Sequence, residues 1–171
     1  MDASADPEGG AGSSFAVYRD KRTTPEIRLT VLMVLVGRRW RALLDEALRP
    51  LGQSSARMEA LSAILNSPEP RSQAEVAKRL RIEGPTMTRM IDALTADGLV
   101  ERSPAPGDRR TKHLTLTPRG EDVLERIFAI ADPLRARLLD GLDAGQIETL
   151  SGLLCDLLGK LDGGLVDSSG D

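Results

Sequence analysis

The apolar pattern changes its period within one short stretch of the chain, and this change limits the possible folds more than any other feature. The segment 72–80 opens on a Ser-Gln-Ala-Glu capping box, which predicts a short helix. After a tight turn, the segment 84–97 opens on Gly-Pro-Thr and stops before a glycine, as a second helix would. The segments 99–102 and 112–116 then alternate between apolar and polar residues, which is typical of strands. A helix, a turn, a second helix and a two-stranded hairpin together predict a winged helix-turn-helix.

Long apolar helices are expected on both sides of this unit. Thr24-Pro25-Glu26 has the order of an N-cap, a first-turn proline and a first-turn acid, and Gly52 ends the helix that follows. Residues 27–36 of that helix are apolar nearly all round, which indicates burial against a second subunit. Asp143 caps a last helix with leucines at three- and four-residue steps. We therefore expect a mostly α protein with a small β-hairpin wing and a helical dimerisation region.

These signals divide the chain into five parts. The expected parts are a disordered N-terminal tail 1–22, a dimerisation helix 23–52, a winged helix-turn-helix DNA-binding domain 53–120, C-terminal dimerisation helices 121–161 and a disordered tail 162–171.

Composition excludes several function classes. The single Cys155 and the single His113 leave no disulfide framework and no Cys- or His-rich metal site, so we expect no cofactor, no metal and no catalytic residue. No P-loop, dinucleotide fingerprint or nucleophile–base pair is recognisable, so we expect no enzyme. The longest apolar run, 31–36, is too short for a membrane span, and we expect a cytoplasmic protein. Cys155 is expected to be a buried, inert thiol in the last helix, and an intersubunit disulfide across a two-fold interface is the alternative.

Basic residues concentrate in the middle of the chain. The whole sequence carries a net charge of −3. Residues 71–120 contain ten basic and six acidic residues, so this segment carries +4 and the rest carries −7. A local positive surface is what a protein needs to contact phosphates, although solvated helix faces would show the same charges.

The second helix of a helix-turn-helix can enter the major groove of DNA. Its first turn here offers donors on Thr86, Thr88 and Arg89, and Met87 is expected to supply an apolar contact. Ser72, at the start of the preceding helix, is a further candidate DNA contact.

The hairpin tip carries two adjacent arginines, Arg109 and Arg110. Guanidinium groups at such a tip can enter a narrow minor groove, where the potential is most negative. Asp108 is expected either to orient an arginine through a bidentate pair or to form the turn by bonding its own backbone.

Six short motifs resemble the MarR family of bacterial transcription regulators, and the SlyA-type branch is the most similar. The motifs are Arg38-Arg39-Trp40, Pro50-Leu51-Gly52, Ile82-Glu83-Gly84-Pro85-Thr86, Leu99-Val100-Glu101-Arg102, Asp108-Arg109-Arg110-Thr111-Lys112 and Leu116-Thr117-Pro118-Arg119-Gly120. The resemblance implies a homodimer that binds a pseudo-palindromic operator in double-stranded DNA. It also places the recognition-helix contacts on Thr86, Thr88 and Arg89, the wing arginine on Arg110, and the holding carboxylate on Asp108.

The resemblance further implies a small aromatic or anionic ligand that releases a repressor from DNA, although an activator would carry the same residues. By position, the candidate ligand-binding residues are Arg38, Trp40, Arg57 and Met58. Met58 stands where the SlyA-like branch often has a tryptophan, and the loss of that ring removes a stacking partner worth about 0.5–1.5 kcal/mol. Core packing is the alternative role for Trp40. The alternative to a DNA-binding transcription regulator is a winged-helix protein-interaction module that does not contact DNA.

Overall fold

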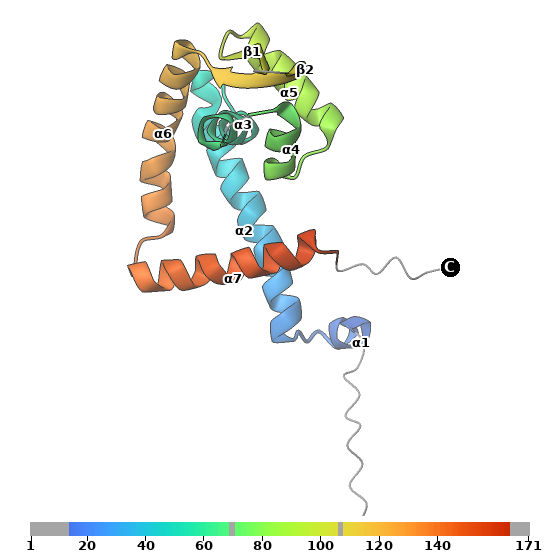
Figure 1. The fold of residues 1–171 in the computed structure, drawn as a ribbon. Coiled ribbons are helices and arrows are strands. Elements are labelled where there is room, and N and C mark those ends of the chain that lie inside the picture. Colours follow the sequence, from blue (N-terminus) through green and yellow to red (C-terminus); the bar gives the residue numbers. More distant parts are fainter. Residues whose placement is uncertain (1–13, 69–70, 106–107, 165–171) are drawn as a thin grey trace, which may run out of the picture. The chain divides into compact units, whose positions relative to one another are not determined.

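The computed structural model describes residues 14–68, 71–105 and 108–164, and the chain divides into two compact units, Met1–Arg57 and Met58–Asp171. Figure 1 labels the helices and the hairpin in chain order. Each unit is described by itself below.

The first unit consists mainly of one long helix. Helix α2 spans Pro25–Leu48, and the Thr24 hydroxyl accepts a hydrogen bond from the backbone N–H of Ile27 at 3.3 Å, as the sequence predicts. The helix passes into a 3-10 turn, η1 (Arg49–Leu51), which ends at Gly52 with φ +65°. This positive φ lies in the left-handed region, which glycine adopts without strain because it has no Cβ atom. The expectation of a tail without structure over 1–22 is wrong in part, because a short helix, α1, forms there over Ser14–Arg19.

The second unit holds most of the core. Its helices are α3 (Ser55–Asn66, which begins in the first unit), α4 (Gln73–Leu80), α5 (Gly84–Ala96), α6 (Pro118–Leu138) and α7 (Ala144–Asp162). The buried apolar side chains of this unit are Ala60, Leu61, Ala63, Ile64, Val76, Ala77, Met87, Ile91, Leu94, Leu99, Val100, Leu114, Leu124, Ile127 and Ala131. Every element from α3 to α6 contributes to this set, so the helices and the hairpin share one core. Full burial of each large apolar side chain contributes about 1.5–3 kcal/mol before conformational entropy is subtracted.

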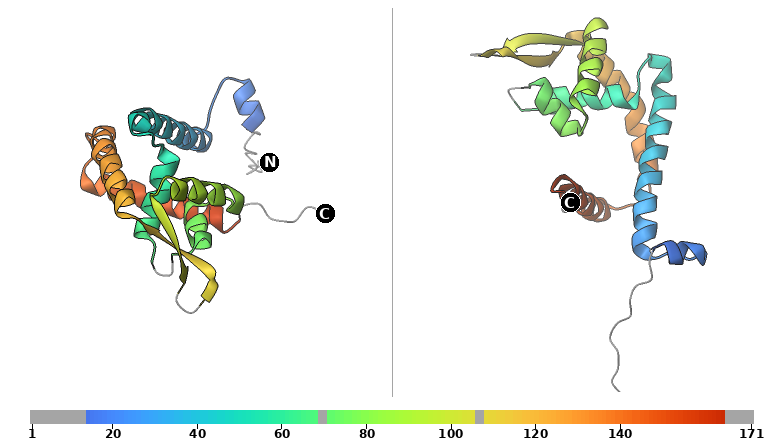
Figure 2. Two further views of the ribbon diagram at one scale, coloured as in Figure 1. Left: turned by 90° about the horizontal axis from the view of Figure 1, so that it is seen from above. Right: turned by 90° about the vertical axis from the view of Figure 1, so that its right-hand side faces the viewer.

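A two-stranded antiparallel hairpin follows α5. Strand β1 spans Val100–Ala105 and β2 spans Asp108–Leu116, with Val100 paired to Leu116. Both strands are longer than the sequence predicts. The pairing becomes irregular near the tip, between Pro104 and Ala105. Figure 2 shows the hairpin extending beyond the helices of its unit, as the wing of a winged helix does.

The base of the hairpin is joined to α6 by a close backbone contact. The Thr117 hydroxyl donates to the carbonyl of Gly98 at 2.7 Å and accepts from the N–H of Gly120 at 3.0 Å. The Thr117 N–H donates to the carbonyl of Leu99 at 3.0 Å. A Cβ atom on Gly120 would lie 2.0 Å from that same carbonyl oxygen, so only glycine fits here. The junction fixes where the wing leaves the core.

Helix α7 is capped as predicted, but none of its residues is fully buried within this chain. Asp143 accepts from the N–H of Gln146 at 2.8 Å, and the Gln146 side chain accepts in return from the N–H of Asp143. Every residue of α7 is described and none is buried, including Leu153 at 58% and Leu161 at 57% exposed. The expectation of a buried Cys155 thiol is wrong for the single chain, because Cys155 is exposed.

Candidate nucleic-acid interface

Helices α4 and α5 are held together by a tight turn. The capping box predicted for α4 is present: the Ser72 hydroxyl accepts from the N–H of Glu75, and the Glu75 carboxylate accepts from the N–H of Ser72, each at 3.2 Å. At the other end, Arg81 has φ +53°, and the N–H of Ile82 donates to the carbonyl of Ala77 at 3.0 Å. Residues 81–83 thus form the turn between α4 and α5.

The first two turns of α5 present donors to solvent. Thr86, Thr88 and Arg89 are all exposed. The Thr88 hydroxyl donates to the carbonyl of Gly84 at 3.0 Å and accepts from the side-chain amide of Gln73 at 2.8 Å. The one proton of the Thr88 hydroxyl is therefore already donated within the protein. Thr86 and Arg89 are exposed nearby on the same helix.

Two residues of the helix-turn-helix depart from what the sequence predicts, Met87 on α5 and Gln73 on α4. Met87 is fully buried, so the expected apolar contact with a base is wrong, and the side chain belongs to the core. Gln73 was not identified from the sequence, yet its amide joins α4 to α5 through Thr88. No local signal marks this pair, because the two residues are 15 positions apart.

An ion pair joins the wing to α5. Arg102 on β1 donates to the carboxylate of Asp92 on α5 at 2.6 Å. This contact gives Asp92 a partner within the protein, so its negative charge is partly neutralised on the helix that carries Arg89. Glu83, the N-cap residue of α5, makes no side-chain cap hydrogen bond and is exposed.

The wing-tip residues are described only in part. The backbone of Asp108, Arg109 and Arg110 belongs to β2. Their side chains lie outside the described part of the structure, so the expected pairing of Asp108 with an arginine is outside it too.

Ser72 lies where the wing meets the helix-turn-helix. It forms an isolated antiparallel bridge with His113 of β2, and the N–H of Leu114 donates to the carbonyl of Arg71 at 2.9 Å. The Ser72 hydroxyl also donates to Glu75 at 3.2 Å. Its side chain therefore serves the cap of α4.

The candidate ligand residues do not lie in one unit. Arg38, Trp40 and Arg57 belong to the first unit, and Met58 begins the second. Arg38 is exposed and Trp40 is half-buried. The Arg57 Nε donates to the side-chain oxygen of Gln53 at 2.8 Å, so part of this guanidinium is engaged locally.

The start of α3 is held by an acidic side chain from α2. Asp45 accepts from the N–H of Ser55 at 2.7 Å. This backbone hydrogen bond, with a further one from the Ser55 hydroxyl, lowers the pKa of the Asp45 carboxyl below its ordinary value. The sequence did not single out this contact.

Comparison with known proteins decides the family. A profile of the MarR family matches residues 52–111. Wild-type apo MarR from E. coli is 30% identical, with a TM-score of 0.65 over 80% of this chain and 99% of that chain. The chain belongs to the MarR family. The crystal structure of transcriptional regulator PA3341 is also similar, at 34% identity and a TM-score of 0.72, over 80% of this chain and 99% of that chain. The mostly helical fold with a two-stranded wing is thereby confirmed.

Two of the similar solved structures contain DNA. A cysteine-to-serine mutant of E. coli MarR in complex with operator DNA is 32% identical, with a TM-score of 0.69 over 77% of this chain and 94% of that chain. The S. aureus MepR–DNA complex shares the fold at 21% identity, with a TM-score of 0.72 over 81% of this chain and 99% of that chain. Membership of the MarR family makes this chain a transcription regulator and not an enzyme.

Among the described helices, none combines the length and apolar character that a bilayer span requires.

Proposed function

We propose that this MarR-family regulator binds a pseudo-palindromic operator in double-stranded DNA as a homodimer and acts as a cytoplasmic repressor. The observation that carries the proposal is the exposed N-terminal part of α5, where Thr86 and Arg89 are exposed to solvent on a helix joined to α4 by the Gln73–Thr88 hydrogen bond. An α-helix of this kind fits the major groove. The operator complex of E. coli MarR, 32% identical to this chain, supports the same use of the fold here.

The proposed contacts fall into two groups. Thr86 and Arg89 contact base edges or phosphates directly from α5, and Arg109 and Arg110 contact DNA from the wing, with Asp108 orienting them. Ser72 and Thr88 act mainly by fixing the two helices, because their hydroxyl protons are already donated within the protein.

Dimerisation is proposed on the exposed apolar residues of α2 and α7. On α7 the leucines share one face at 100° per residue, whereas Gly152, Cys155 and Asp156 lie on the opposite face. On α2, Leu32 and Leu35 are 45% and 49% exposed. Surfaces of this character are typical of obligate interfaces. The proposed division of the chain keeps α2, α6 and α7 as dimerisation helices around the winged helix-turn-helix.

A small aromatic or anionic effector is proposed to bind near Arg38, Trp40, Arg57 and Met58 and to release the operator. The support is positional and comes from the sequence motifs, as does the assignment to the SlyA-like branch. Arg38 is the exposed cation of the set, which suits a carboxylate or phenolate.

The test begins with DNA selected from a random pool by the wild-type protein. Arg89→Ala is then compared with Arg126→Ala, which removes the same charge from an exposed position on α6. Each good base contact is worth about 1–3 kcal/mol, and the homodimer loses one from each subunit, so Arg89→Ala should weaken binding by about 30-fold to 2 × 10⁴-fold. Arg126→Ala should change it less than about 2-fold. Equal affinities of the two variants in fluorescence anisotropy would contradict the proposed recognition helix.

A further inference from the structure

The last residue of α7 reaches the turn of the helix-turn-helix. The Arg81 Nε donates to one oxygen of Asp162 at 2.8 Å, and its Nη2 donates to the other at 2.5 Å. This two-bond fork is the strong geometry for an arginine–carboxylate pair. It joins residues 81 positions apart and lowers the pKa of the Asp162 carboxyl, so the pair is ionised at neutral pH.

The backbone at Arg81 makes this contact more than a chance meeting of surface side chains. Arg81 adopts the left-handed conformation at the end of α4, with φ +53°. A residue with a Cβ atom pays about 1–2 kcal/mol there, which glycine would avoid. The Arg81 N–H closes the turn by donating to the carbonyls of Ala77 and Lys78. The side chain that holds Asp162 therefore stands on the backbone that sets the angle between α4 and α5.

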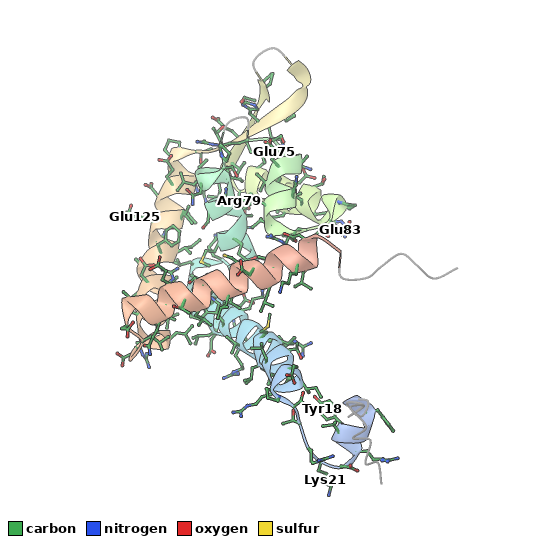
Figure 3. The ribbon with its side chains drawn as sticks, turned by 60° about the horizontal axis from the view of Figure 1, so that its bottom comes forward. Tyr18, Lys21, Glu75, Arg79, Glu83 and Glu125 are labelled. Atoms are coloured by element: carbon green, nitrogen blue, oxygen red, sulfur yellow. The ribbon has the colours of Figure 1, made fainter. Side chains whose placement is uncertain are left out.

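The charges around Arg81 give Asp162 a second role. A groove of about 450 Å³ beside α4 is lined by Lys78, Arg79 and Arg81, with Glu75 as its acidic side chain. The Glu75 carboxylate already accepts hydrogen bonds from the N–H and the hydroxyl of Ser72. Figure 3 labels Glu75 and Arg79, which belong to α4, and α7 contacts the end of this helix through the Arg81–Asp162 pair. Asp162 thus adds a negative charge where three cations repel one another.

We propose that Asp162 is a positioning residue for DNA binding, which acts through Arg81 to fix the start of α5 relative to α7. The inference rests on the proposed function, because α5 is the helix proposed to enter the groove. Since α7 also carries the leucine face proposed for dimerisation, the pair links the dimer helix to the DNA-contacting helix within one subunit. An exposed ion pair contributes little to global stability, so its effect belongs to the arrangement of the helices.

The experiment compares Asp162→Asn with Asp156→Asn in the full-length dimer. Asp156 lies on the same helix, is exposed, and carries the same charge. Both changes raise the net charge by one, so general attraction to phosphates rises equally. With the selected duplex, Asp162→Asn should bind about 3-fold more weakly than Asp156→Asn, with equal midpoints of urea unfolding. Arg81→Gln should lose a comparable factor relative to Arg126→Gln, which removes an equal charge from α6, and the double variant Arg81→Gln with Asp162→Asn should lose no more.

Two results would overturn the inference: equal affinities of the two aspartate variants, or losses of Arg81→Gln and Asp162→Asn that multiply in the double variant. Absence of binding by the wild-type protein to any selected duplex would instead overturn the proposed function. In that case, amide hydrogen exchange at Ile82 still tests the positioning role of the Arg81–Asp162 pair. The Ile82 N–H closes the turn by donating to the carbonyl of Ala77. Exchange about 3-fold faster in Asp162→Asn than in Asp156→Asn supports the positioning role, and equal exchange refutes it.

Discussion

Gly120 has the least room for a side chain among the described glycines. A Cβ atom there would lie 2.0 Å from the carbonyl oxygen of Leu99 and 3.0 Å from its carbonyl carbon. Both atoms are backbone, so no side chain can rotate away. The same oxygen accepts the N–H of Thr117 at 3.0 Å, and a shift of either segment would lengthen that hydrogen bond.

Gly120→Ala should therefore destabilise the protein by about 3 kcal/mol, which combines an overpacking cost of about 1–3 kcal/mol with about 1 kcal/mol for the weakened hydrogen bond. For a chain of this size the melting temperature should fall by about 6–12 °C. Circular dichroism during thermal and urea unfolding measures the change. Gly152→Ala is the control, because nothing lies within 4 Å of its added Cβ on α7 and helix propensity predicts a gain of up to about 1 kcal/mol. A Gly120→Ala protein as stable as wild type would refute the close contact between the wing base and α6.

Three further predictions each concern a single residue. Hydrogen bonds from Ser55 lower the pKa of the Asp45 carboxyl in the folded state. The ionised carboxylate therefore stabilises the folded state at pH values above its unfolded pKa of about 3.9. This stabilisation is lost as the pH falls through the lower folded pKa. Asp45→Asn should accordingly be less stable than wild type at pH 7 in urea unfolding, with the difference shrinking below about pH 4; a difference independent of pH would contradict this. Thr88→Val should cost about 1 kcal/mol in the same assay, because Gln73 loses its acceptor, whereas an unchanged midpoint would show that the bond contributes nothing. Cys155 lies opposite the leucine face of α7, so in the native dimer it should react with a thiol reagent at a rate near that of the unfolded chain, and full protection would refute the proposed interface.

Local signals in the sequence predicted the helices well. Thr24, Ser72 and Asp143 each cap a helix in the structure, because an N-cap needs only a hydroxyl or carboxylate and the N–H groups two or three residues later. The hairpin was recognised from its two-residue alternation. Helix α1 was missed, because its six residues are too few to show a helical period in the sequence.

Contacts between distant residues were not predictable in the same way. Met87 was expected to face DNA, but which side of α5 faces the core depends on α4 and the wing, and the methionine is fully buried. Gln73 bonds Thr88, and Arg81 bonds Asp162, across 15 and 81 positions. Nothing in the residues next to either partner marks such a pair. The site is thus predictable as a surface of donors, whereas the internal contacts that orient those donors require the structure.

The salt dependence of DNA affinity tests the central claim most directly. If each dimer contacts about six phosphates, the affinity of the wild-type protein for its selected duplex should fall by about 10³-fold between 50 and 200 mM salt. An affinity that stays constant over this range would show that the exposed donors of α5 and the wing do not contact the DNA backbone.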